Sequence, residues 1–361
     1  MLFHFFVSLI DQYSFLNVFK YLTFRTGLSV VTSLIVVFII GAPLIKTFSE
    51  KMITGPIRQD GPIDHIVKKS GTPTMGGVII IIGIITSTIL WADLTNIYVW
   101  TLIFVSLSLG GLGLLDDVLK IKHKNSRGLK SLYKFSGQLI IGSLALFFLI
   151  KYSNHDYLYN LYFPFFKNLI WQMGLFFIPF GLFVIIGASN AVNLTDGLDG
   201  LATVPVMLVA ISFTLISYVV GNTIFSDYLQ IQYIPDVGEL SIFCGSIVGA
   251  CLGFLWYNAP PAKIFMGDTG SLSLGGSLAA IAIIVKHEIV LAIIGGLFVL
   301  ETVSVIIQVI SFKLTGKRIF KMAPIHHHFE KKGWAESTIV IRFWIIAIIL
   351  ALVGLATLKL R

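Results

Sequence analysis

The sequence has 361 residues, of which 56% are hydrophobic and only 12% are charged, and its mean hydropathy is +0.90. A soluble globular domain carries roughly 25% charged residues, so this composition excludes a water-soluble protein and indicates an outer surface that meets lipid. The formal net charge is +8, but the basic residues are gathered in a few loops between apolar runs, which argues against a nucleic-acid partner.

The apolar runs predict an all-α polytopic membrane protein with a single integral membrane domain over residues 1–361. The segment up to Tyr21 carries Asp11 and Lys20 and has no clear cleavage site, so we expect it to lie along the membrane interface. A helix needs about 20 mostly apolar residues to cross the hydrocarbon. The stretches that meet this requirement predict ten transmembrane helices: 23–45, 75–92, 97–115, 132–150, 173–190, 201–220, 240–257, 270–286, 289–312 and 338–358.

The distribution of Lys and Arg predicts the orientation of these helices. The odd-numbered loops hold 18 of these residues and the even-numbered loops hold three. Cytoplasmic loops carry the excess of positive charge in membrane proteins. The odd loops are therefore expected in the cytoplasm, and both termini are expected in the periplasm.

Two adjacent carboxylates, Asp116 and Asp117, end the third apolar stretch. Acids at a helix C-terminus face the negative end of the helix dipole and repel each other, so a nearby cation is expected. Lysines 120, 122 and 124 could supply it, and so could a bound divalent metal. The competing interpretation is a solvated helix end.

The fifth loop contains Asn193, Asp196 and Asp199, spaced so that a helical turn would bring the three toward one face. Two acids without Lys or Arg break the positive pattern of the neighbouring loops, which indicates a binding site. An Asx-rich turn that joins two helices is the structural alternative.

The seventh loop contains Asn258, Lys263 and Asp268, and Asp268 precedes a predicted helix start, where it could serve as an N-cap. With the two preceding acidic clusters, it makes five Asp on one membrane face. Oxygen ligands of this kind suit Mg²⁺, which typically uses one or two carboxylates together with substrate phosphates.

The ninth loop contains His326, His327 and His328. Three consecutive side chains are poorly placed to share one metal, so hydrogen bonds to a phosphate, base or sugar fit them better. A solvated basic loop is the alternative. Because that loop lies outside the hydrocarbon, its substitution is expected to cost little stability.

These motifs, in this order, resemble the polyprenyl-phosphate N-acetylhexosamine 1-phosphate transferases over nearly the whole chain. The segment from Lys69 to Gly77 begins a helix with glycines and a Thr-Pro pair, which favours phosphate binding. This segment and the run from Pro324 to Glu330 resemble the branch that transfers phospho-N-acetylmuramoyl-pentapeptide.

The resemblance implies a reaction in which UDP-N-acetylmuramoyl-pentapeptide and undecaprenyl phosphate give lipid I and UMP, with Mg²⁺, at the cytoplasmic face of a bacterial inner membrane. It also implies a ten-helix fold that is commonly a homodimer. By resemblance, Asp268 is the metal ligand, and Asp116 and Asp117 are candidates to deprotonate or orient the lipid phosphate; a covalent role for an Asp stays open. The implied substrate-binding residues are Lys69, Thr74, Lys134, Asn193, Asp196, Asn258, His326, His327 and His328.

Two other functions compete with this interpretation. A sibling enzyme would use UDP-N-acetylglucosamine instead. A transporter would place polar groups near the bilayer midplane, whereas the five Asp lie at predicted cytoplasmic helix ends. Glu301 is the exception, and a pairing inside the bundle would explain it.

Overall fold

The computed structural model describes the chain except for residues 56–70, 124–127, 154–155, 167–168 and 360–361. Lys69, which is predicted to bind substrate, therefore lies outside the described residues. Within the described part of the chain, nine helices are long and apolar enough to cross a membrane. These are α2 (Leu22–Glu50), α5 (Ile97–His123), α6 (Ser131–Ser153), α7 (Phe177–Thr195), α8 (Thr203–Val220), α10 (Leu240–Asn258), α11 (Gly267–Ile284), α13 (Gly296–Thr315) and α15 (Glu336–Ala356).

All ten stretches predicted from the sequence are helical over most of their length, but several helices have other bounds than expected. The third helix, α5, continues eight residues past its predicted end to His123, so Asp116 and Asp117 lie within the helix and the expectation that they end it is wrong. Two further stretches differ more strongly. The second forms α4 (Gly77–Trp91), which has only 15 residues. The ninth is divided, because α12 (Glu288–Ile294) ends at Gly295 and α13 begins directly after it. An apolar run does not by itself show where a helix breaks.

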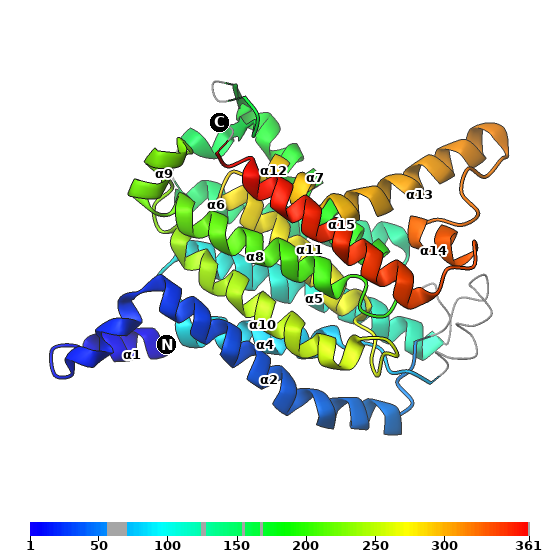
Figure 1. Cartoon of the computed structure of the whole chain (residues 1–361), viewed down its shortest axis with the longest axis horizontal. Helices are drawn as coiled ribbons and strands as arrows, with labels where there is room; N and C mark the ends of the chain where they lie inside the picture. Colours follow the sequence, from blue (N-terminus) through cyan, green and yellow to red (C-terminus); the bar gives the residue numbers. More distant parts are fainter. Residues whose placement is uncertain (56–70, 124–127, 154–155, 167–168, 360–361) are drawn as a thin grey trace.

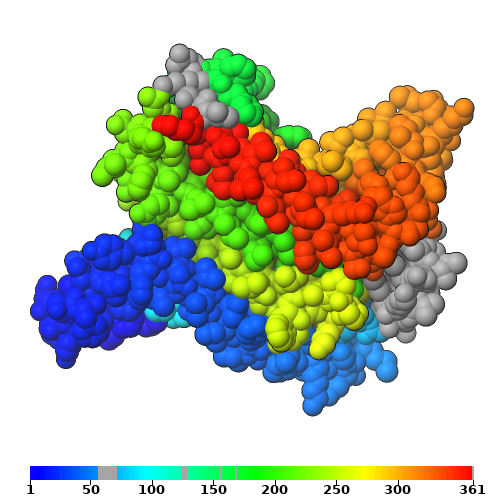
Figure 2. Space-filling model, viewed as in Figure 1, coloured from blue at the N-terminus to red at the C-terminus, as the bar shows by residue number. Residues whose placement is uncertain are grey.

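The remaining elements are short and join or flank the long helices. At the N-terminus, α1 (Leu2–Ser8) and η1 (Ser14–Lys20) stand out from the body of the molecule, as Figure 2 shows in blue. The others are η2 (Asp156–Tyr159), β1 (Asn160–Tyr162), β2 (Ile170–Gln172), η3 (Gly174–Phe176), α9 (Thr223–Leu229), η4 (Val237–Glu239) and α14 (Ile325–Glu330). The two strands form an antiparallel hairpin in which Leu161 lies opposite Trp171.

The centre of the bundle is α11, whose residues are 94% buried, whereas in the other long helices 22–72% of the residues in the most apolar 18-residue stretch are buried. It packs against α5 and α7 most extensively, and also against α4 and α8 (Figure 1). Small residues, four glycines, three serines and three alanines, make up ten of its 18 residues, so neighbouring backbones approach it closely. This placement puts the first residues of α11, including Asp268, at the end of a fully enclosed helix.

At the end of the bundle that holds this start of α11, α13 inclines away from the other helices, and α14 returns from its far end (Figure 1). Figure 1 also shows both chain termini toward the opposite end. The termini thus lie on one side, as the charge distribution predicts, and the candidate site lies near the other end. Which side faces the cytoplasm stays a prediction from the Lys and Arg count.

Candidate active site

Three buried carboxylates meet where the C-terminal part of α5 approaches the first turn of α11. Oxygens of Asp116, Asp117 and Asp268 lie within 4.8 Å of one another. A glycine permits this approach, because a Cβ at Gly113 would lie 2.2 Å from the backbone oxygen of Asp268. Since Asp116 and Asp117 are only 2% and 3% exposed, the alternative of a solvated helix end is wrong.

Asp117 binds the start of α11 from outside that helix. Its carboxylate accepts hydrogen bonds from the Asp268 amide at 3.2 Å, the Thr269 amide at 3.0 Å and the Thr269 hydroxyl at 2.8 Å. It thereby satisfies backbone donors that the first turn leaves free, and it faces the positive end of the helix dipole. The sequence offered Asp268 as the N-cap, but Asp117 of α5 performs that task.

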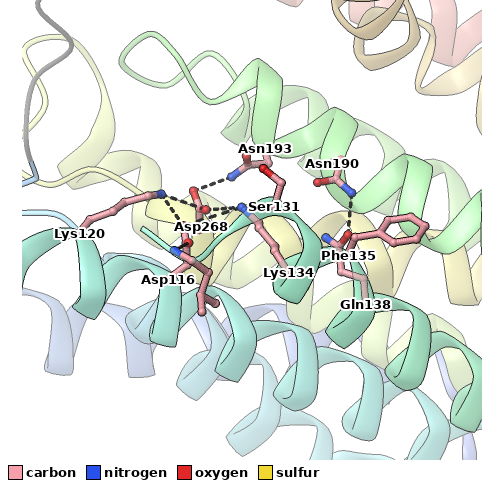
Figure 3. Close-up of a pocket in the computed structure, with 10 residues that line it drawn as sticks. Asp116, Lys120, Ser131, Lys134, Phe135, Gln138, Asn190, Asn193 and Asp268 are labelled. Carbon is pink, nitrogen blue, oxygen red and sulfur yellow. Dashed lines mark hydrogen bonds and ion pairs between the residues drawn. The ribbon is translucent and has the colours of Figure 1, made fainter. Parts of the chain in front are cut away.

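Two lysines offset part of the negative charge. Lys120 lies 2.6 Å from Asp116 and 3.0 Å from Asp268, and Lys134 lies 2.5 Å from Asp268 (Figure 3). Of the three lysines proposed after Asp117, Lys120 contacts Asp116 and Asp268, Lys122 is exposed, and Lys124 lies outside the described residues. Three carboxylates against two ammonium groups leave one negative charge in excess. Such a set of hard oxygen ligands can hold a divalent metal ion.

Asn193, on the last turns of α7, donates from Nδ2 to Asp268 and to the Ser271 hydroxyl, each at 2.8 Å. Asp196 follows α7 and accepts the Gly267 amide. Burial, followed by the charges of Asp268 and Asp117, raises the pKa of Asp196 to about 7.

Asp199 has a separate position, because its carboxylate accepts the Ala262 amide at 2.9 Å. The prediction that Asn193, Asp196 and Asp199 share one helical face is therefore wrong. The helix ends at Thr195, and the chain turns at Asp196 with φ −77° and ψ 52°.

Asn258 holds two loops together. Its Oδ1 accepts the Gly200 amide and the Thr203 hydroxyl, and its Nδ2 donates to the Ile264 carbonyl at 2.9 Å. The side chain is 2% exposed. These bonds position the residues between α10 and α11 relative to those after α7, whereas the predicted contact of Asn258 with substrate stays a prediction.

Thr74 lies beside the acidic cluster because its segment runs along the residues before α11. Gly76 and Gly77 donate their amides to the carbonyls of residues 265 and 266 at 2.8 Å. Gly267 has φ +72°, and a Cβ there would lie 2.6 Å from an Asp117 carboxylate oxygen and 3.2 Å from the Thr74 hydroxyl. Only glycine fits between these groups with this backbone conformation.

The three histidines point toward different partners, as expected for consecutive side chains. His326 is fully buried and lies 3.1 Å from Glu301 of α13. His327 binds Glu330 at 2.5 Å, and His328 accepts the Lys321 amide at 3.0 Å.

The alternative of a solvated histidine loop is wrong for two of these residues, because His326 and His327 are 0% and 8% exposed. Binding of substrate by the three histidines stays a prediction. The sequence suggested that Glu301 pairs inside the bundle, and its partner is His326. On its other side, His326 packs against the loop of Asp196, since a Cβ at Gly197 would lie 2.3 Å from its Nε2. Partial burial and the charges of Lys332 and Lys321 lower the pKa of His328.

A cavity of about 490 Å³ opens beside the acidic cluster (Figure 3). It is lined by Asp116, Lys120, Leu129, Ser131, Lys134, Phe135, Gln138, Asn190, Asn193 and Asp268. Ser131 and Gln138 are cavity residues that were not predicted from the sequence. Their polar character, at spacings of three and four residues from Lys134 on one apolar helix, is the signal that could have indicated them.

Comparison with known sequences gives the family of this chain. Residues 99–286 match the glycosyl transferase family 4, and residues 69–81 match the first signature of the phospho-N-acetylmuramoyl-pentapeptide-transferases. A phospho-N-acetylmuramoyl-pentapeptide-transferase of Pelagibacter ubique (strain HTCC1062) is 68% identical, with both chains covered completely. The chain belongs to this transferase family. Another transferase of this family, from Maricaulis maris (strain MCS10), is 54% identical and is also covered completely.

The family assignment agrees with the geometry of the site. The transferase signature includes Lys69 and Thr74, and Thr74 lies beside the acidic cluster. The glycosyl transferase match includes both α5 and α11, which supply the three carboxylates. The resemblance inferred from the sequence motifs is thus confirmed.

Proposed function

We propose that the protein transfers phospho-N-acetylmuramoyl-pentapeptide from UDP-N-acetylmuramoyl-pentapeptide to undecaprenyl phosphate, releasing UMP and forming lipid I. The observation that carries this proposal is the end-to-end identity of 68% to a relative named for phospho-N-acetylmuramoyl-pentapeptide transfer. The buried cluster of Asp116, Asp117 and Asp268 supports it, because these carboxylates could hold a divalent metal ion, and phosphoryl transfer between anions needs concentrated positive charge.

The three carboxylates fit Mg²⁺, and Asp268, in contact with both lysines, is the ligand that we assign first. When bound there, Mg²⁺ would neutralise the diphosphate of the nucleotide-sugar and stabilise the departing UMP. Lys120 and Lys134 provide further positive charge at the cavity wall, where anionic phosphate oxygens can approach.

Asp116 and Asp117 are assigned different tasks in the proposed mechanism. Asp117 is committed to three donors at the start of α11, and it does not line the cavity. Asp116 lines the cavity, where it accepts the Leu129 amide and contacts Lys120. We therefore assign Asp116 to accept a proton from the lipid phosphate or to orient it. The phosphate oxygen then attacks the phosphorus attached to the sugar, and the bond to UMP breaks.

We also propose a membrane location and an oligomeric state for the enzyme. We place the site at the cytoplasmic face of a bacterial inner membrane, because the loops at this end carry the excess of Lys and Arg. A homodimer is part of the proposal by family resemblance.

The function is tested with the purified protein in detergent and undecaprenyl phosphate. UDP-N-acetylmuramoyl-pentapeptide should yield UMP and a lipid product, and chelation of Mg²⁺ should stop the reaction. UDP-N-acetylglucosamine should yield neither. Turnover of UDP-N-acetylglucosamine alone would assign the protein to the sibling activity, and no turnover of either would remove the proposal. A transporter is not favoured, because Glu301, the acid that lay apart from the others, is paired with His326.

A further inference from the structure

The hydrogen bonds of Asn190 determine how the amide of Gln138 is oriented. Asn190 donates from Nδ2 to the Ile186 carbonyl at 2.8 Å, so this atom must be the nitrogen. The same nitrogen lies 2.9 Å from Gln138, which must therefore present its oxygen there (Figure 3). The Nε2 donor of Gln138 consequently points away from Asn190.

This donor has no partner among the described residues, although Gln138 is 1% exposed. Buried amide donors in proteins nearly always find an acceptor. Gln138 also lines the cavity beside the acidic cluster. An acceptor supplied by a bound molecule would complete its hydrogen bonds.

The neighbours of Gln138 on α6 indicate which acceptor fits. Ser131, Lys134 and Gln138 lie at helical spacing, and all three line the cavity. Lys134 and Lys120 give this cavity the positive charge that suits a phosphate group. Hydrogen bonds from a carboxamide N–H and an ammonium group to a phosphate oxygen are charge-assisted, and therefore stronger than hydrogen bonds between neutral groups.

The position of the cavity favours the lipid phosphate over the nucleotide diphosphate. Gln138 lies four residues after Lys134, which is about 6 Å further along α6 from its charged end. The cavity wall includes Phe135, which is 51% exposed, and the neighbouring Leu139 and Ile140 are 40% and 60% exposed. An apolar outer face of this kind meets lipid, so a lipid head group can reach the cavity from within the membrane.

We propose that Gln138 binds the phosphate of the polyprenyl carrier, with Nε2 donating to a phosphate oxygen while Asn190 holds the amide in place. This inference rests on the proposed function, since it concerns the lipid substrate of that reaction. Gln138 is in this sense a residue that positions the attacking phosphate next to Asp116 and Lys134.

The test measures KM for undecaprenyl phosphate and for UDP-N-acetylmuramoyl-pentapeptide in the wild-type protein and in two variants. Gln138→Met keeps the length of the side chain but removes the donor, and Gln138→Glu keeps an acceptor for Asn190 but places a negative charge beside the phosphate. We expect KM for the lipid to rise about tenfold in the first and further in the second. KM for the nucleotide-sugar should change less than about twofold.

Asn96→Ala is the matched control, because Asn96 is a buried carboxamide at the other end of the bundle, bonded to the Asp236 carbonyl and the Tyr98 amide. It should lower thermal stability without changing either KM. A rise in KM for the nucleotide-sugar instead would place the diphosphate at Gln138 and overturn the inference. Unchanged KM values in both Gln138 variants would also overturn it. Wild-type turnover, measured first, separates either result from a failure of the proposed function.

Discussion

Replacing His326 with alanine is expected to destabilise the protein far more than the same change at His328. His326 and Glu301 are both 0% exposed and 3.1 Å apart. The Glu301 carboxylate has no hydrogen bond to any other described residue. Truncating the histidine would leave this acid buried without its partner, and breaking a buried pair in this way costs about 3–5 kcal/mol.

His328 gives a direct comparison within the same short helix. It is partly exposed, and its ring accepts one hydrogen bond, from the Lys321 amide. Loss of such a bond costs about 0.5–1.5 kcal/mol. The two variants should therefore differ by at least about 1.5 kcal/mol in the free energy of unfolding.

Thermal unfolding of both variants in one detergent measures this difference. The Glu301→Gln change and its combination with His326→Ala complete a double-mutant cycle, and the combined loss should be clearly smaller than the sum of the two single losses. Equal unfolding temperatures for His326→Ala and His328→Ala would refute the buried pair as a source of stability. Activity of the His328 variant, which should stay folded, then reports on substrate binding alone.

Further changes test the charge and orientation of the site. Asp268→Asn should lower UMP release at saturating Mg²⁺ by at least about a thousandfold, because a bound metal contributes several kcal/mol of transition-state stabilisation. The unfolding temperature should stay close to wild type. Near-normal turnover would remove Asp268 as the metal ligand. Because the pKa of Asp196 is raised to about 7 in the folded protein, its protonated form is favoured, and the metal-free protein should lose stability as the pH rises from about 4 to 7. Asp196→Asn should flatten that dependence in melting curves recorded with chelator, and an unchanged slope would contradict the assignment. A cysteine at Asn222 should react with an impermeant reagent added outside intact cells, and one at Gly333 should not. The two native cysteines are buried and should contribute little background labelling. The reverse pattern would invert the topology.

The length and polarity of the apolar runs were sufficient to predict where helices form. Each predicted stretch is helical because a chain in lipid must satisfy its backbone hydrogen bonds internally. The break at Gly295 was not predictable, because glycine is common within membrane helices. The end of α7 at Thr195 was also missed, since the turn there depends on the bond between Asp196 and Gly267.

The residue types of the site were predictable, but their pairing was not. Local motifs identified Asp117, Asp268 and the histidines as polar groups in unusual places. That Asp117 caps a helix more than 140 residues later follows only from the packing of α5 on α11. The pairing of His326 with Glu301 likewise joins two elements whose approach no sequence spacing reveals.

Groups from four helices stabilise the acidic cluster. The backbone donors at the start of α11 bind Asp117, Lys120 of α5 and Lys134 of α6 contact Asp268, and Asn193 of α7 donates to it. Without these donors, three carboxylates within 4.8 Å would repel one another strongly in a buried site. None of the four helices alone supplies all the donors that offset the repulsion between the carboxylates. The site therefore forms only when these helices pack together, so a change that loosens α11 would disturb catalysis even when it leaves every catalytic side chain intact.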